Sequence, residues 1–223
     1  MIKKLFVACC LLFCWYFGFV SLIFAEGYTL SLPRIEATYC DETFSSPGGI
    51  SYQYHNSQWP EWLDITELVN LNALPGRITI DTLEMAEEKL CFSMVRPTYL
   101  PEELQFRVVR VEGYESVGIY YSVLLYFGHL FDPPFIELRI IQDYVGPKAT
   151  LELKTDHLIK PMEYEGQTYL CTIFEKENYA SMTLHWLEDD FCFRVEFTNV
   201  TNITYPYLEE ALRVAASLTF AEE

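Results

Sequence analysis

Basic side chains are scarce in this sequence. Among 223 residues, 15 are Lys or Arg, whereas 32 are Asp or Glu, and the formal net charge is −17 at pH 7. Proteins that bind nucleic acid do so largely through clustered Lys and Arg side chains that contact phosphates. The charge balance therefore argues against nucleic acid as a partner, and its simplest consequence is solubility.

The short motifs of common catalytic and cofactor sites are also missing. The sequence has no G-x-S-x-G, no H-E-x-x-H, no phosphate-binding loop and no dinucleotide fingerprint. Its four histidines lie far apart, and His129 with Asp132 is the one pair considered for metal or acid–base chemistry. Glu84 and Glu88 are four residues apart on an expected helix, but no histidine stands nearby to complete a metal site. We therefore assign no catalytic, cofactor-binding or metal-binding residues, and we expect no cofactor.

Residues 1–25 have the features of an export segment. Lys3 and Lys4 precede an uncharged run from Leu5 to Phe24, and Ala25 ends an acceptable cleavage site. The run is longer than the about 7–15 apolar residues of a signal peptide and close to the about 20 residues that span a bilayer. The segment is either a cleaved signal peptide or an N-terminal membrane anchor formed by residues 5–25. In both cases the rest of the chain is expected to be secreted or extracytoplasmic.

Four cysteines follow the export segment, at Cys40, Cys91, Cys171 and Cys192. An even number in an exported chain permits disulfides, and none of the four has the close C-x-x-C spacing of a zinc site. Cys171 and Cys192 lie on neighbouring expected strands and are the first candidates for a pair. Free buried thiols are the alternative, because cysteine packs well as a small apolar residue.

Residues 26–76 are predicted to form an irregular N-terminal extension, with a loop at 43–49 and a short strand at 51–54. Trp59 and Trp62 fall in this extension. Exposed tryptophans would mark a binding surface, whereas packing against the core is the more common fate of such residues.

Two helices are expected. The first spans about 81–90, with Asp81 as its N-cap and Glu84 completing a capping box. Its apolar positions, Leu83, Ala86 and Leu90, share one face. The second spans about 206–218 and begins at a proline, which suits a first helical position.

The remaining segments alternate apolar and polar residues as β-strands do. Ser181 to Phe197 reads as a hairpin with an acidic turn at residues 188–190, and its outer face was expected to be half-solvated, with His185 at the surface. Tyr120, Tyr121 and Tyr126 either line a groove or supply strand packing. The pattern predicts an α+β domain over residues 77–223. It would contain a twisted antiparallel sheet of about six to eight strands, with both helices packed on one face.

The stretch around residues 92–102 resembles an uncharacterised extracytoplasmic domain of Gram-positive bacteria. That domain often forms the C-terminal outer part of anti-sigma-factor-like or lipoprotein-like membrane proteins. The similarity covers about residues 80–220 and is carried by three ordered motifs, at Pro97, Tyr99, Leu100, Pro101 and Glu102, at Leu184, Trp186 and the turn 188–190, and at Glu210, Ala211, Leu212, Ala215, Ala216, Ser217 and Leu218. Glu103 stands where the family usually has glycine. The resemblance implies location and fold more than chemistry, and because four residues precede the apolar run, direct anti-sigma activity is not expected. Tyr99 and Leu100 are expected to be core residues.

The functional expectation is a non-enzymatic binding or sensor module that contacts an unknown protein or ligand in the cell envelope. Two alternatives stay open at this point, namely a hydrolase of envelope material whose site is not recognised, and a structural envelope component.

Overall fold

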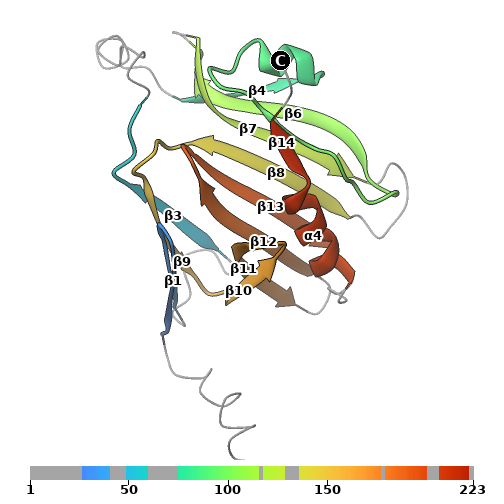
Figure 1. Cartoon of the computed structure of the whole chain (residues 1–223). Coiled ribbons are helices and arrows are strands. Elements are labelled where there is room, and N and C mark those ends of the chain that lie inside the picture. The colour runs from blue at the N-terminus through green and yellow to red at the C-terminus, as the bar shows by residue number, and fades with distance from the viewer. Residues whose placement is uncertain are drawn as a thin grey trace, which may run out of the picture.

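The computed structural model describes residues 27–40, 49–59, 75–115, 118–128, 136–176, 179–199 and 206–220. The largest element of this structure is an eight-stranded antiparallel sheet (Figure 1). From one edge to the other its strands are β10 (Leu158–Tyr164), β11 (Gln167–Lys176), β12 (Tyr179–Glu188), β13 (Phe191–Asn199), β8 (Glu137–Tyr144), β7 (Ile119–Gly128), β6 (Gln105–Tyr114) and β4 (Gly76–Ile80). The expected α+β fold with an antiparallel sheet is confirmed.

Tight turns with left-handed backbone join neighbouring strands at one end of this sheet. The expected hairpin is formed by β12 and β13, which pair from Ala180 opposite Asn199 to Glu188 opposite Phe191. Asp189 follows with a φ of 46°. The β10–β11 turn has positive φ at both central residues, Glu165 (51°) and Gly166 (83°), as two-residue hairpin loops require. Local turn chemistry therefore sets the register of both hairpins.

A second sheet of four strands contains the segment that was expected to be irregular. Its order is β1 (Thr29–Leu32), β2 (Ile35–Tyr39), β9 (Thr150–Thr155) and β3 (Ile50–His55), and β2 runs parallel to β9. The short strand expected at residues 51–54 is present as β3, whereas the prediction of irregular structure is wrong for β1 and β2. β2 and β3 both pair with β9, which comes about 100 residues later in the sequence, and a local pattern contains no information about a partner that distant.

Both helices are shorter than expected. The first, α3 (Leu83–Glu87), is capped by Thr82, whose Oγ1 accepts a hydrogen bond from the Met85 backbone N at 3.3 Å, so the assignment of Asp81 as N-cap is wrong. Asp81 and Thr82 are both of a type that N-caps helices well. Thr82 is the one that has the extended backbone an N-cap needs. Of the expected apolar face, Ala86 is fully buried, and Leu83 and Leu90 pack against the core.

The C-terminal helix α4 (Pro206–Ala216) ends two residues before Leu218. Leu218–Phe220 instead forms β14, which pairs antiparallel with β5 (Val95–Pro97). The loop after β5 is fixed to the same region, because the Tyr99 hydroxyl donates to the Glu210 carboxylate of α4. Tyr99 and Leu100 are half-buried against the main core, in agreement with their interpretation as packing residues.

The large sheet has two differently covered faces. Odd-numbered residues of β13, such as Phe193 and Val195, belong to the apolar core that also contains Ala86 of α3 and Ala211 of α4. Cys192 points the other way and joins a second core with Leu151 and Leu153 of β9. The small sheet therefore covers the β11–β13 part of the second face, and Figure 1 shows it at the left of the molecule, with α4 over β12 and β13. The same face over β6, β7 and β8 lies beyond the small sheet.

The structure overturns two expectations about β11, β12 and β13. His185 is fully buried, its ring tilted against Tyr52 of β3 at 5.7 Å between centroids, so its placement at the surface is wrong. Cys171 and Cys192 are both fully buried and free. They lie on strands separated by β12, with their side chains in different cores, and a disulfide across a sheet is sterically excluded.

Candidate functional site

A cleft of about 410 Å³ opens where the small sheet stops covering the large one. Alternate residues of β6, β7, β8 and β13 form its floor, and the end of β3 with the segment Ser57–Trp59 forms its wall. The described lining comprises Tyr54, Ser57, Gln58, Trp59, Arg77, Arg110, Val111, Glu112, Tyr114, Tyr121, Ser122, Leu124, Ile141, Asp143, Tyr144, Val145 and Arg194. Its volume is at the lower end of the range for small-molecule sites, which is about 300–1,000 Å³.

Three aromatic rings gather at one end of the cleft. Trp59 packs against Tyr121 with 5.6 Å between ring centroids and against Tyr114 with 6.1 Å, and the two tyrosines are 5.8 Å apart. These separations lie within the 4.5–7 Å of direct ring contact. These three residues are called the aromatic trio below. The two alternatives considered for Trp59 are combined, because its ring packs on the sheet and also lines a cavity.

A charged pair also lines the cleft, between the two sheets. Arg194 Nη2 donates to Asp143 Oδ2 at 2.5 Å, and the two side chains are 18% and 12% exposed. Asp143 also accepts hydrogen bonds from the Tyr54 hydroxyl at 3.1 Å and from Ser122 Oγ at 2.5 Å. The guanidinium of Arg194 lies 4.8 Å above the ring of Tyr52. Burial of two charges is tolerated here because the carboxylate has three donors and the cation has a counterion and a ring.

A second charged pair borders the cleft closer to solvent. Arg77 of β4 donates from Nε to Glu112 Oε2 of β6 at 2.6 Å, and the Tyr121 hydroxyl is 3.5 Å from the other carboxylate oxygen. Arg77 is 70% exposed, so this pair is expected to contribute little to stability. It does fix the orientation of Glu112 and of the Tyr121 ring.

Burial shifts the tyrosines of the cleft toward their protonated forms. Burial raises the pKa of Tyr121 to about 12, and the Glu112 carboxylate acts in the same direction. Burial also raises the pKa of Tyr54, as do the neighbouring Cys192 and Asp143. For Arg194, burial lowers the pKa, but the Asp143 carboxylate and the phenols of Tyr54 and Tyr52 raise it more, so the net direction is upward. At neutral pH both tyrosines are hydrogen-bond donors and Arg194 is a fixed cation.

Few groups suited to proton transfer or nucleophilic attack are among the described residues that line the cleft. No His, Cys or Lys is among its described lining residues, and both carboxylates are engaged by Arg partners. Ser122 donates to Asp143, whose carboxylate is paired with Arg194, and no histidine is among the described lining residues to activate the hydroxyl as a nucleophile. Across the described part of the chain, no cluster of three or more His, Cys, Asp or Glu side chains could hold a metal ion.

Some residues singled out by sequence line the cleft, and the others lie elsewhere. Tyr121 and Trp59 line the cleft, Tyr120 is 4% exposed in the core, and Tyr126 lies beneath Arg110. His129, Asp132 and Trp62 lie outside the described residues, as does the expected export segment. Glu84 and Glu88 are exposed on α3.

The charged residues of the cleft were not selected by sequence reasoning. Arg110, Glu112 and Tyr114 occupy alternate positions of β6, opposite in direction to Val109 and Val111. That alternation was a usable signal for a polar sheet face. It could not reveal that another sheet would wall the face into a cleft.

The sequence matches no family model, no curated protein and no solved structure. The functional argument therefore depends on the geometry of the cleft. Neither α3 nor α4, the helices of the described chain, has the length and apolar character needed to cross a membrane.

Proposed function

We propose that this protein is a non-enzymatic binding module that takes a small ligand in the cleft between its two sheets. The observation that carries the proposal is the cleft itself, a cavity of about 410 Å³ with contacting aromatic rings at one end and oriented charged groups along its floor. Ligand sites typically combine apolar and aromatic walls with a few convergent polar groups. A component with a purely structural role would gain nothing from such a cavity.

The alternative of an envelope hydrolase has less support. Hydrolysis requires a positioned nucleophile with a base, or a carboxylate free to exchange a proton. In the described lining, Asp143 accepts three hydrogen bonds and Glu112 is held by Arg77. These carboxylates orient other groups, and proton transfer would break the contacts that hold them.

The proposed setting is the outside of the cell, as a secreted or membrane-anchored sensor in the envelope. It is supported by the apolar segment at residues 5–24 and by the resemblance to an extracytoplasmic domain. We further propose that α3 and α4 cover the same face of the large sheet. Ala86 of α3 and Val214 of α4 belong to the same core, and this arrangement leaves the opposite face for the cleft.

The proposal is tested by screening a chemically broad library of small molecules against the purified full-length protein, with thermal shift as the first measurement and NMR titration as the second. Binders should perturb resonances of cleft residues. Replacing Tyr121 with Ala should weaken their binding about tenfold, because a ring contact is lost from the aromatic trio.

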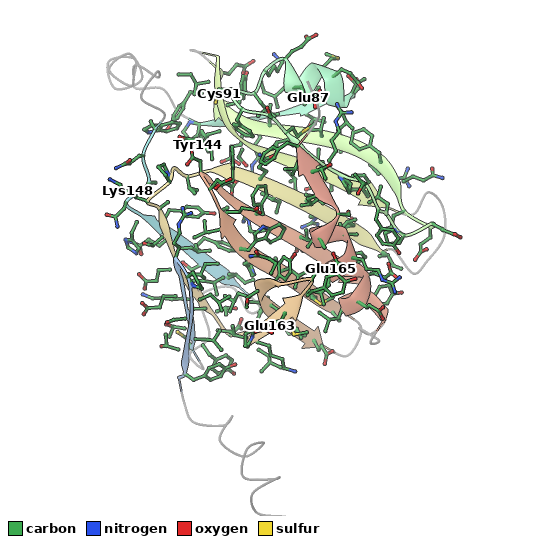
Figure 2. All side chains as sticks on the ribbon, in the orientation of Figure 1. Glu87, Cys91, Tyr144, Lys148, Glu163 and Glu165 are labelled. Carbon is green, nitrogen blue, oxygen red and sulfur yellow. The ribbon has the colours of Figure 1, made fainter. Side chains whose placement is uncertain are left out.

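Lys160→Gln is the matched control. Lys160 is an exposed residue of β10, at the edge of the large sheet opposite to β4. Figure 2 shows Glu163 of the same strand well away from Tyr144, which lines the cleft. If binders perturb residues elsewhere and Tyr121→Ala leaves every affinity unchanged, the cleft is not the ligand site.

A further inference from the structure

The net charge of the cleft is opposite in sign to that of the whole chain. Its described lining contains three guanidinium groups, Arg77, Arg110 and Arg194, and two carboxylates, Glu112 and Asp143. The cleft thus has one positive charge in excess, whereas the chain has a formal net charge of −17. A locally positive hollow in an acidic protein concentrates anions where the rest of the surface repels them.

Arg110 is the source of the excess. Arg77 pairs with Glu112 at 2.6 Å and Arg194 pairs with Asp143 at 2.5 Å. Arg110 donates from Nη1 to the Tyr126 hydroxyl at 3.2 Å, and its guanidinium lies 4.8 Å from the centre of that ring. Among the described residues no carboxylate lies within 4.0 Å of it. A phenol and a ring face hold the guanidinium in place but leave it without a counterion.

Stacking against Tyr126 also prepares Arg110 for a ligand. A guanidinium has five donors in a flat fork that matches a carboxylate with two parallel hydrogen bonds. The contact with Tyr126 uses one nitrogen and one face, and the remaining donors are available at the cleft. Because the side chain is already oriented, less conformational entropy is lost when an anion binds.

The aromatic trio indicates the other part of the ligand. Its rings are 5.6–6.1 Å apart and touch each other, so they do not surround an empty centre as the rings of a cage for a quaternary ammonium group do. The three guanidinium groups would also repel a cation. A surface of packed rings suits a flat or ring-shaped group that lies against it.

The aromatic trio and Arg110 are close to each other along β6. Tyr121 of the trio reaches Glu112, which is two residues from Arg110 on the same strand. Two strand residues span about 7 Å. A ligand that touches both the trio and Arg110 therefore presents its ring to the trio and its anionic group to Arg110.

We propose that the cleft binds a small molecule with a single ring and a single carboxylate, with the carboxylate on Arg110 and the ring against the aromatic trio. This inference rests on the proposed binding function and specifies its ligand class. One carboxylate balances the single excess charge, whereas a phosphate monoester, with a charge of about −1.5 to −2, would exceed it. The ring could be aromatic or a sugar, and both belong to the same binding chemistry.

The test compares matched acids and amides by calorimetric titration of the full-length protein at pH 7 and low salt. The aromatic arm uses 4-hydroxyphenylacetate against 4-hydroxyphenylacetamide, and the sugar arm uses glucuronate against glucuronamide. The protein should bind the acid at least about tenfold more tightly than the amide in one arm, since a charge-assisted pair is lost in the amide. The arm that shows the preference identifies the ring type.

Arg110→Gln should remove the preference for the acid, lowering the acid affinity by about ten- to one-hundredfold and the amide affinity much less. Lys160→Gln removes the same formal charge far from the cleft and should keep the preference. Equal binding of acid and amide by the wild-type protein would overturn the ligand assignment while leaving the binding function intact. Binding of neither compound in both arms would also overturn it, and the library screen would then decide the binding function separately. A preference that survives in Arg110→Gln would show that the carboxylate binds elsewhere.

Discussion

Asp143→Asn removes the carboxylate that faces Arg194 between the two sheets. The amide has the same shape, so the change acts on charge and hydrogen bonding rather than on packing. Arg194 is 18% exposed and its Nε has no hydrogen-bond partner among the described residues, so the carboxylate is its counterion. The gross attraction of two charges about 4 Å apart is about 4 kcal/mol near a protein surface. Leaving one charge of a buried pair without a partner costs about 3–5 kcal/mol.

For a domain of this size that loss corresponds to a decrease in melting temperature of about 10 °C. Thermal unfolding followed by circular dichroism at pH 7 measures it, with urea unfolding as the second measurement. Arg194→Met should cost a similar amount, because it leaves Asp143 buried and charged. The double variant should cost less than the sum of the two by about 2 kcal/mol, since neither charge is then left unpaired.

Two results would refute this reasoning. One is a melting temperature for Asp143→Asn within about 2 °C of wild type, which would mean that water or another group compensates the cation. The other is a coupling energy below about 0.5 kcal/mol in the double-variant cycle, which is the scatter expected of independent sites.

Two further predictions concern the strands around the cleft. Burial lowers the pKa of His185 to about 3, with Arg194 acting in the same direction. The unfolded chain takes up a proton below about pH 6.5, so stability should fall by about 2 kcal/mol between pH 7 and pH 5. Urea titrations should show this loss in the wild type and not in His185→Gln, and equal pH slopes would contradict it. Gly113→Ala should destabilise by about 1–3 kcal/mol, because its Cβ would lie 2.1 Å from the Ile119 carbonyl oxygen and 2.4 Å from Tyr120 Cα. The matched change Gly76→Ala meets nothing within 4 Å and should be nearly neutral, so similar thermal shifts for the two would contradict the steric argument.

The elements that sequence predicted well are those with local causes. The β12–β13 hairpin follows from alternation and an acidic turn, and α4 begins at Pro206 as expected. The short helix near residue 85 follows from its apolar spacing, although its cap is Thr82. Errors appear where a tertiary partner decides. Leu218 was expected at the end of the helix but belongs to strand β14, because β5 provides a strand for it to pair with.

The candidate site was largely beyond the reach of sequence. Tyr121 was considered as a groove or packing residue and Trp59 as a binding-surface or core residue. Their contact with each other requires β7 to meet a segment about 60 residues earlier in the chain, which no local pattern shows. Arg110, Asp143 and Arg194 lie on β6, β8 and β13, and β13 pairs with β8 although four strands separate the two in the sequence. Their polar character was visible, but their convergence was not.

The sequence by itself determined the alternation that makes most of the described chain β, the turns of its hairpins, and a strongly acidic net charge. These properties depend on residues within a few positions of one another, or on composition alone. The tertiary structure decided that β9 would join the N-terminal strands into a second sheet. The second sheet buries His185 and Cys192 but does not cover β6, β7 and β8. The cleft forms where this coverage ends. The physical reason is that the free energy of a covered sheet face comes from contacts between segments distant in sequence, which local patterns do not encode.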